Sequence, residues 1–233
     1  MLLVFFSCNE EEEKKAQPLT MGQLTISKEQ PSPGDEIELI YNSNDDVEAF
    51  YAYMVDDKNY PLDIDFTQKD DEQKASIKIP DSAVALAFII KANDQFDHND
   101  KKGYLLPLYT KDGEQIQGSN AATSFYAVNY GSNYGIEMDE KVAFEAIKTD
   151  LTTYPELQSA WNNSYLRMAF KNNQEEGKKL IDAYADSMQK KSDVSEKEYT
   201  AIMQAYSMTG DESKVDSIKK VTLQKYPKGS TAN

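Results

Sequence analysis

The residues best suited to chemistry lie in one short polar segment, residues 94–100, which contains three aspartates, an asparagine and a histidine. Calcium binds about six to eight hard oxygen ligands, and Asp and Asn side chains in a tight loop supply them. The segment therefore contains a candidate calcium site, formed by Asp94, Asp97, Asn99 and Asp100. The spacing does not match the EF-hand loop, however. It favours the alternative interpretation, a solvated turn in which Asp and Asn bond to local backbone groups.

Two aromatic residues flank the same turn and point to a different ligand. Phe96 lies inside the segment, and Tyr104 follows it directly after a glycine. The arrangement resembles part of some starch-binding sandwich modules, in which the large, rigid faces of aromatic side chains stack on sugar rings. Cell-surface glycan binding through residues 97–104 is therefore an alternative function, with Phe96 and Tyr104 as the ligand-binding residues.

The sequence contains no recognisable catalytic constellation. His98 is the only histidine, and no nucleophile accompanies it for which it could act as a base. A single histidine also excludes a two-histidine zinc site, and no glycine-rich phosphate-binding loop is present. We therefore expect His98 to lie in an exposed turn. We expect no enzymatic activity, and no cofactor apart from the candidate calcium ion.

The only cysteine, Cys8, lies in a segment that predicts lipidation. Residues 2–7 are apolar and end in the small residue Ser7, directly before Cys8. This pattern is similar to the end of a bacterial lipoprotein signal peptide, in which the cysteine becomes the acylated first residue of the mature protein. The positively charged residues that usually open such a signal are absent. An ordinary N-terminus with a free thiol is the alternative interpretation.

An acidic stretch follows Cys8. Residues 10–13 are consecutive glutamates, and like charges at this density do not pack, so residues 9–20 are expected to form an extended tether. The tether is similar to those of some gram-negative surface lipoproteins. Residues 1–8 would then be a signal-peptide remnant and lipobox. The protein would be extracytoplasmic and lipid-anchored to a bacterial membrane, at the periplasmic or outer-membrane surface.

The formal net charge of −15 excludes several kinds of partner. A chain this acidic has no basic footprint that could displace counterions from phosphate, so nucleic acid binding is not expected. Attraction of a surface helix to anionic lipid is excluded for the same reason. The only long apolar run, residues 2–7, is far too short to span a bilayer. A single cysteine also excludes an internal disulfide.

Strands must position the candidate turn. Apolar patterns predict seven short strands, at residues 24–26, 37–41, 50–55, 75–79, 84–90, 104–109 and 124–128. Residues 84–90 are apolar throughout, which is typical of a strand buried on both faces. Pro107 cannot donate to a ladder, so residues 104–109 are expected at a sheet edge or a bulge. Short strands separated by turn residues predict an antiparallel sandwich over residues 21–130.

Several turn and strand motifs resemble those of a known family. They are Pro-Ser-Pro-Gly-Asp at 31–35, Asp-His-Asn-Asp at 97–100 with Gly103 and Tyr104, Pro-Leu-Tyr at 107–109 with Asp-Gly at 112–113, and Gly118. Through these motifs, residues 22–130 resemble the immunoglobulin-like N-terminal region of TlpA-like thiol:disulfide oxidoreductase lipoproteins of gram-negative bacteria. The resemblance implies a non-catalytic region that a thioredoxin domain with a Cys-x-x-Cys pair follows. This chain contains no such pair.

After residue 135 the hydrophobic period changes from two to about 3.6, which predicts helices. Five apolar stripes are present, at residues 143–151, 157–168, 180–188, 199–206 and 215–221. Asp139 can cap the first helix, and Pro155 suits the start of the second. Ser195 and Glu198 have the spacing of a capping box for the fourth. Trp161 lies on an apolar stripe and is expected to pack between helices.

The helical segments repeat. Tyr-Pro at residues 154–155 recurs at 226–227, and Met-Gln at 188–189 occupies the corresponding place between them. The intervals of 34 and 38 residues are close to the period of tetratricopeptide helix pairs. Residues 210–229 also resemble the second helix and exit turn of that family. Such arrays need a cap or a neighbour at each end, so the natural chain is expected to continue past Asn233.

These observations predict a two-domain chain, all-β then all-α. An immunoglobulin-like antiparallel β-sandwich (residues 21–130) would be followed by a tetratricopeptide-like α-helical array (residues 136–233). The expected function is that of a non-catalytic scaffold or binding region in an extracytoplasmic lipoprotein, the N-terminal part of a thioredoxin-like thiol:disulfide oxidoreductase. Its expected partners are a protein or a following redox domain, and a membrane through the lipid on Cys8.

Overall fold

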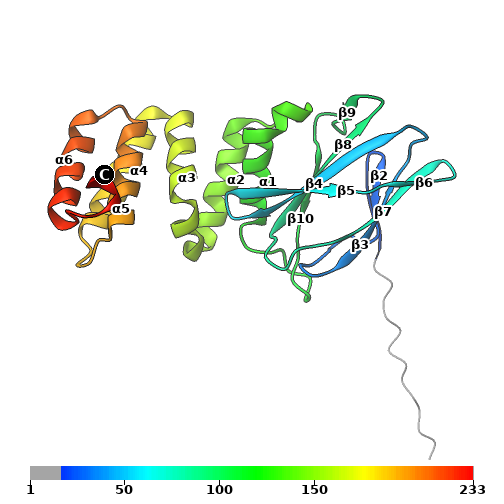
Figure 1. The fold of residues 1–233 in the computed structure, drawn as a ribbon, viewed down its shortest axis with the longest axis horizontal. Helices are drawn as coiled ribbons and strands as arrows, with labels where there is room; N and C mark the ends of the chain where they lie inside the picture. Colours follow the sequence, from blue (N-terminus) through cyan, green and yellow to red (C-terminus); the bar gives the residue numbers. More distant parts are fainter. Residues whose placement is uncertain (1–16, 233) are drawn as a thin grey trace, which may run out of the picture.

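The computed structural model describes residues 17–232 of the chain. In this range an all-β part precedes an all-α part, which confirms the predicted order (Figure 1). The β part contains ten strands: β1 (Leu19–Met21), β2 (Leu24–Ile26), β3 (Glu36–Tyr41), β4 (Val47–Val55), β5 (Lys58–Ile64), β6 (Thr67–Lys69), β7 (Glu72–Lys78), β8 (Ala85–Ala92), β9 (Gln95–Asp97) and β10 (Tyr104–Pro107). The sequence pattern missed β1, β6 and β9, which have three residues each, and β5, which contains a proline.

The ten strands form two five-stranded antiparallel sheets. Sheet A has the order β1-β2-β3-β7-β6. Sheet B has the order β10-β8-β4-β5, with β9 paired to β8. The two sheets share one core, in which Ile37 and Leu39 of sheet A pack with Leu86 and Phe88 of sheet B. Burial of apolar surface, at about 25 cal/mol per Å², is the main force that holds the sheets together.

Strand β8 is buried on both faces, as predicted. Leu86 and Phe88 face sheet A, whereas Ala87 and Ile89 contribute to a second core on the outer side of sheet B. The alternation follows from strand geometry, in which successive side chains point to opposite faces. Strand β10 pairs with β8 and lies at the edge of sheet B, so the edge position predicted from Pro107 is also confirmed.

A helix covers the outer face of sheet B. The prediction of a strand at residues 124–128 is wrong, because these residues lie within α1 (Ser119–Tyr130). The small side chains of Ala121 and Ala122 are buried against the sheet and allow a close approach. The first turn of α1 is held from outside the helix, since a carboxylate oxygen of Asp150 accepts the Ala121 N–H at 2.9 Å. Contacts distant in sequence therefore decide the conformation of this segment.

The five helices predicted from the 3.6-residue period are all present. They are α2 (Glu140–Thr153), α3 (Gln158–Asn172), α4 (Gln174–Gln189), α5 (Glu196–Met208) and α6 (Glu212–Lys225), with short 3₁₀ helices η1 (Gly131–Tyr134), η2 (Pro155–Leu157) and η3 (Ser230–Ala232). Asp139 caps α2 by accepting two backbone N–H groups, and Ser195 forms the predicted capping box with Glu198. In residues 17–232, no helix is both long enough and apolar enough to cross a membrane.

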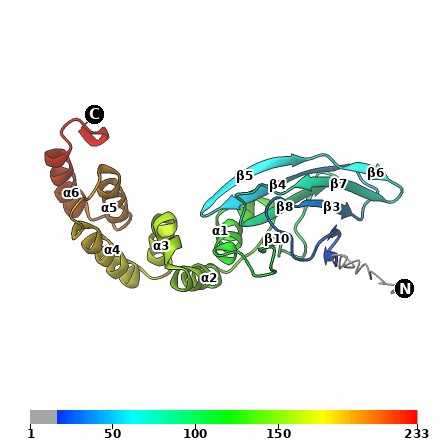
Figure 2. The same ribbon diagram turned by 90° about the horizontal axis from the view of Figure 1, so that it is seen from below.

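The helices pack in consecutive pairs, α1 with α2, α3 with α4 and α5 with α6, and they extend away from the sheets (Figure 2). Trp161 of α3 is fully buried between helices, as expected, with its ring edge-to-face with Phe125 of α1 at 5.6 Å. The Ser164 hydroxyl donates to Asp57, in the β4–β5 turn, at 2.6 Å. Sheet B and helices α1–α3 thus share one core, and the predicted domain limits at residues 130 and 136 fall inside it. Another core holds α3–α6 together.

Candidate functional site

The polar segment singled out in the sequence forms tight turns beside sheet B. Asn93 and Asp94 connect β8 to β9 with φ angles of 48° and 62°, the left-handed conformation that a two-residue hairpin requires. Asn and Asp adopt this conformation more readily than other non-glycine residues. The Asp94 carboxylate forms an ion pair with Lys91 at 2.8 Å, so it is directed back along its own hairpin.

Asp97 links the two sheets. Its Oδ2 accepts hydrogen bonds from the hydroxyl of Tyr41 in sheet A, at 2.9 Å, and from the hydroxyl of Tyr104 in sheet B. Its Oδ1 accepts the backbone N–H of Asn99 at 3.0 Å. Burial raises the pKa of both tyrosines, and the neighbouring carboxylate raises it further. Both phenols therefore stay protonated and act as donors.

Three of the four predicted calcium ligands are engaged by other groups of the protein. Asp94 and Asp97 have the partners described above, and the Asn99 amide donates to the carbonyl of Gly103 at 3.0 Å. Within residues 17–232, no group of three or more His, Cys, Asp or Glu side chains could hold a metal ion. Calcium binding by Asp94, Asp97, Asn99 and Asp100 stays a prediction. The hydrogen bonds favour the interpretation as a solvated turn.

The structure makes only one of the two predicted sugar-stacking residues accessible. Phe96 is 41% exposed, whereas Tyr104 is 1% exposed and lies in the core between the sheets. This corrects the expectation for Tyr104, which offers no ring face to a ligand because its side chain points inward to Asp97. His98 is exposed, as expected, and its Nδ1 accepts the backbone N–H of Lys101 at 3.0 Å.

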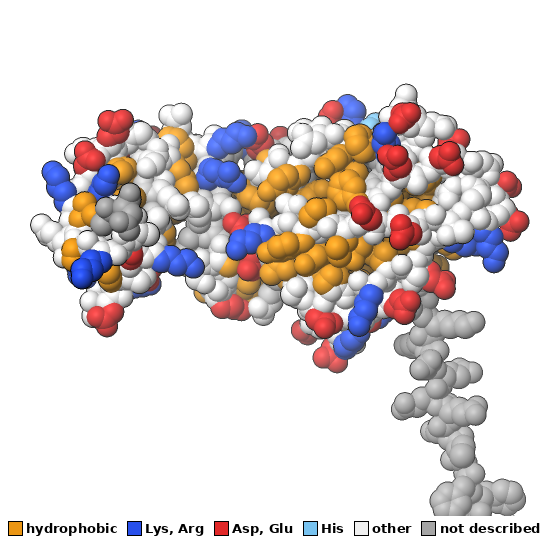
Figure 3. All heavy atoms as spheres, viewed as in Figure 1, with side chains coloured by type: hydrophobic (Ala, Val, Ile, Leu, Met, Phe, Trp, Pro, Cys, Tyr) orange, Lys and Arg blue, Asp and Glu red, His pale blue; other side chains and the backbone are white. Residues whose placement is uncertain are grey.

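A different surface combines aromatic and polar side chains. It is a groove between β5 and α1, here named the aromatic groove, with a volume of about 290 Å³. Figure 3 shows hydrophobic side chains gathered on this side of the molecule, over β5 and its neighbours. The residues that line the groove are Phe50, Asn59, Pro61, Asp63, Tyr126, Tyr130 and Tyr134. Its size is near the lower limit for a ligand site, and its mixture of apolar walls with a few polar groups is typical of one.

Strand alternation and helical spacing bring the lining residues together. Every second residue of β5 from Asn59 to Asp63 lines the groove, because alternate side chains of a strand share a face. Tyr126, Tyr130 and Tyr134 are spaced by four residues and lie along one side of α1 and η1. That spacing is a sequence signal for a common helical face. The strand predicted at residues 124–128 obscures this signal.

The aromatic rings of the groove support one another. The Tyr134 ring is edge-to-face with Phe50 at 5.8 Å and with Phe96 at 5.2 Å. The rings of Tyr126 and Tyr130 are 5.5 Å apart and tilted. Offset and edge-to-face pairs of this kind stabilise ring orientations beyond simple burial. Phe96, which the sequence did single out, is therefore connected to the groove through Tyr134.

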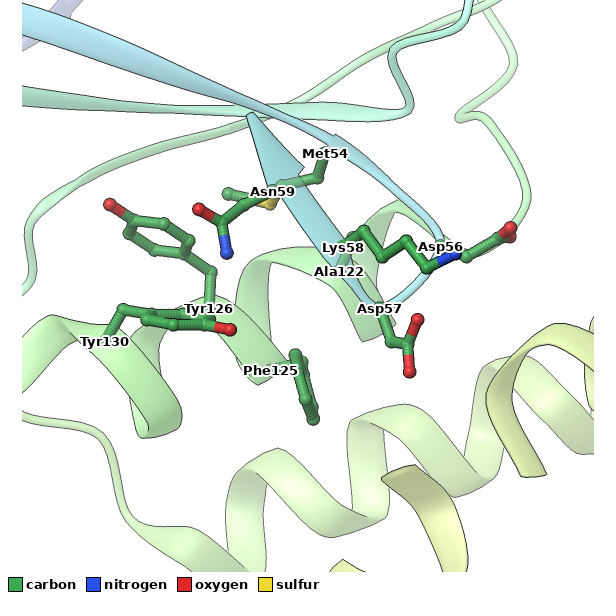
Figure 4. Close-up of a pocket in the computed structure, with 9 residues that line it drawn as sticks. All are labelled: Met54, Asp56, Asp57, Lys58, Asn59, Ala122, Phe125, Tyr126 and Tyr130. Carbon is green, nitrogen blue, oxygen red and sulfur yellow. The ribbon is translucent and has the colours of Figure 1, made fainter. Parts of the chain in front are cut away.

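The polar groups of the groove have no hydrogen-bond partner among residues 17–232. In the described part of the chain, no hydrogen bond or ion pair engages the Asn59 amide, the Asp63 carboxylate or the hydroxyl of any groove tyrosine. Figure 4 shows the recess beside the groove, where the Asn59 amide points toward the rings of Tyr126 and Tyr130. Burial raises the pKa of Tyr126, and its tyrosine neighbours raise it further. This phenol stays protonated and can donate.

Acidic residues dominate the surroundings of the groove. Asp56 and Asp57 lie in the adjoining recess with Lys58. Burial raises the pKa of Asp56, and the Asp57 carboxylate raises it further against the opposing effect of Lys58. Asp63 lies in the groove, and no Lys, Arg or His among residues 17–232 lines it. Since no Ser or Cys of this range lines it either, the groove can bind and orient a ligand, but its described lining includes no nucleophile–base pair of the kind used in acyl transfer.

Cys8, the predicted lipidation site, lies outside the described residues. The acidic run at residues 10–13 also lies outside them. Lipidation and the tether at residues 9–16 therefore stay predictions. The end of the predicted tether is wrong, because Leu19 and Thr20 pair with β2 as part of strand β1.

Comparisons with known proteins leave the function to be argued from the residues themselves. No family model matches the chain. No curated protein matches it.

Proposed function

We propose that the chain is the non-catalytic scaffold or binding region of an extracytoplasmic lipoprotein, the N-terminal part of a protein resembling TlpA-like thiol:disulfide oxidoreductases. The observation that carries this proposal is the core shared by sheet B and helices α1–α3. A shared core joins sheets and helices into one body, as a scaffold requires in order to hold a redox domain or a protein partner in place. Lipid on Cys8 would anchor it to a bacterial membrane, at the periplasmic or outer-membrane surface.

The finer fold assignments form part of this proposal. Two antiparallel sheets with a common core support an immunoglobulin-like sandwich. Three helix pairs support a tetratricopeptide-like array, because the second helix of each pair ends at an equal interval of 36 residues, at Thr153, Gln189 and Lys225. Tyr154 and Tyr226, which follow the first and last of these helices, have nearly equal φ angles of −125° and −126°.

An insulin-reduction assay tests the redox part of the proposal. The chain has one cysteine, so it contains no dithiol that could resolve a mixed disulfide. We expect reduction by the natural full-length protein and none by these 233 residues. Activity of the present chain would contradict the proposal, and so would a natural protein without a Cys-x-x-Cys pair.

Detergent-phase partitioning tests the anchor. If Cys8 carries lipid, the native protein enters the detergent phase, and a Cys8→Ala variant stays in the aqueous phase. Mass spectrometry of the native N-terminal peptide should then show an acylated cysteine. Equal partitioning of the two proteins, together with a free Cys8 thiol, would rule out the lipoprotein assignment.

A second candidate function is glycan binding at the cell surface. The observation that favours it is the exposed ring of Phe96, which contacts Tyr134 of the aromatic groove. Titration against starch-like and other oligosaccharides, with and without calcium, tests this function. Phe96→Ala should weaken binding, whereas Val142→Ala, which truncates an exposed apolar residue on α2, should not. The absence of binding across a broad panel would remove this candidate.

A further inference from the structure

We propose that the aromatic groove binds a neutral pyranose unit of an oligosaccharide. This inference rests on the second candidate function, glycan binding, and it assigns the site to the groove instead of the turn at residues 97–104. The rings of Tyr130 and Tyr134 would contact the sugar ring. The side chains of Asn59 and Asp63 would bind its hydroxyl groups.

The aromatic rings suit the apolar faces of a sugar. The C–H groups of a pyranose carry partial positive charge, and the face of an aromatic ring carries partial negative charge, so the two attract. Tyr130 is 37% exposed at the groove and is available for this contact. Tyr134 is held in place by Phe50 and Phe96, at 5.8 Å and 5.2 Å. A ring that is already held loses little conformational entropy when a ligand binds.

The free hydrogen-bonding groups suit the hydroxyls of a sugar. Asn59 offers an amide donor and acceptor, Asp63 offers a carboxylate acceptor, and Tyr130 offers a phenol. None of the three side chains has a hydrogen-bond partner in the described part of the protein. An apolar ligand would desolvate these groups without bonding them, which costs free energy. A ligand rich in hydroxyl groups would satisfy them, so the groove favours a sugar over a lipid or an apolar peptide.

The charge around the groove selects an uncharged sugar. Asp63 lies in the groove, Asp56 and Asp57 lie in the adjoining recess, and the whole chain has a net charge of −15. In the part of the chain that the structure describes, no Lys, Arg or His lines the groove to offset this charge. Uronic acids and sulfated or phosphorylated sugars would be repelled by the negative potential. Neutral hexoses and pentoses would not be affected.

The outer edge of β5 is the main competing explanation for an exposed apolar surface here. Strand β5 pairs with β4, and no strand in the described range pairs with its other edge. A peptide could add there as a further strand and cover Tyr60 and Leu62, which are exposed on the opposite face from the groove. Pro61 lies in the middle of this edge and has no N–H to donate, which disfavours strand addition.

Isothermal titration calorimetry of the full chain tests the proposal. The probes are maltohexaose, cellohexaose, mannohexaose and xylohexaose as neutral ligands, and hexagalacturonate as an acidic one. We expect saturable binding of at least one neutral probe and none of the acidic probe. Tyr130→Ala should weaken this binding about tenfold or more, because it removes a stacking ring. Tyr130→Phe should retain most of the affinity, because it keeps the ring.

The matched control is Tyr60→Ala, which removes an equally large side chain from the opposite face of β5 and should leave binding unchanged. Circular dichroism shows whether each variant folds. If Tyr130→Ala does not fold, Asn59→Ala replaces it, with the same expected direction.

The outcomes separate this inference from the function on which it rests. No saturable binding of any neutral probe would overturn both. Binding that is lost in Phe96→Ala and kept in Tyr130→Ala would overturn the groove site and leave glycan binding at the turn. Equal losses in Tyr60→Ala and Tyr130→Ala would assign the ligand to the edge of β5 and overturn the groove site. Tighter binding of hexagalacturonate than of the neutral probes would contradict the charge argument and, with it, the proposal.

Discussion

In the two sheets, contacts that position the strands join residues 56 and 76 positions apart, whereas in helices α4–α6 they join residues closer in the chain, such as Lys214 and Asp182, 32 positions apart. Tyr41 of sheet A bonds to Asp97, 56 positions later, and Lys111 bonds to Asp35, 76 positions earlier. At the end of the molecule away from the sheets, Ser195 caps α5 by accepting the Glu198 N–H, within one helical turn. Helix α6 packs on α5, its neighbour in sequence.

This difference determines how far a local change should spread. The core between the sheets and the core outside sheet B both include residues of β8. A core substitution in β8 should therefore destabilise both sheets and helices α1–α3. The core formed by helices α3–α6 is a different one, and many of the side chains packed against it are partly exposed, such as Tyr184 and Met188. Regions with fewer fully buried contacts open at lower free energy. We therefore expect helices α4–α6 to unfold without the sheets, and three measurements test this expectation.

The largest effect is expected from Phe88→Ala in β8. Phe88 is buried between the sheets, and truncation of a buried Phe lowers the free energy of unfolding by about 3–5 kcal/mol. Urea unfolding measures the loss. Hydrogen exchange should rise in both sheets and in α1–α3 while α5 and α6 keep their protection. If protection falls equally in α5 and α6, the two regions unfold as one unit and the comparison fails.

An intermediate effect is expected from Gly177→Ala in α4. A Cβ at this position would lie 2.2 Å from the Cα of Phe170 in α3, a backbone atom that cannot move unless the helix moves. Overpacking of this kind costs about 1–3 kcal/mol, more than the gain in helix propensity from alanine. Hydrogen exchange should rise in α3–α6 and stay unchanged in sheet A. Lys178→Ala, an exposed neighbour, is the control and should change little. Wild-type stability in Gly177→Ala would argue against the close approach of the two helices.

The smallest effect is expected from the protonation of Asp35, in the turn before β3. Burial raises the pKa of this carboxyl, but hydrogen bonds from Lys111, Lys28 and the Ser32 N–H outweigh it and lower the pKa from 3.8 to about 2. A lowered pKa in the folded state stabilises the protein above pH 3.8, and this contribution is lost as the pH falls through about 2. Because Lys111 is solvent-exposed, the contribution is at most roughly 2 kcal/mol.

Thermal unfolding between about pH 4 and pH 2 measures this contribution. The wild type should lose more stability over that window than Asp35→Asn, which lacks the titrating carboxyl. Parallel curves for the two proteins would show that the long-range contact between Asp35 and Lys111 contributes nothing to the stability of sheet A.

Much of the fold could be predicted because its determinants are local. The caps at Asp139 and Ser195, together with the 3.6-residue apolar period, predict α2 to α6, since helical hydrogen bonds join residues four apart. The continuous apolar run of residues 84–90 predicts the doubly buried strand β8 for a similar reason. Of the candidate ligand-binding residues, Phe96 is predictable from the sequence, because Asp- and Asn-rich turns are exposed.

Tertiary structure alone decided α1, β5 and the aromatic groove. The aromatic and β-branched residues at 124–128 suit a strand, but they become helical because Asp150 bonds the first turn of α1 and sheet B offers an apolar face to cover. The proline of β5 argues against a strand, yet β5 forms because β4 pairs with it along its length. Tyr104 follows a polar turn, yet its side chain is buried, because the Asp97 carboxylate accepts a hydrogen bond from its hydroxyl. The deciding partner lies 29 positions away for α1, seven positions away for Tyr104 and across a two-residue turn for β5. In each case the pattern of apolar and polar residues does not say which other group will satisfy a hydrogen bond or cover an apolar face.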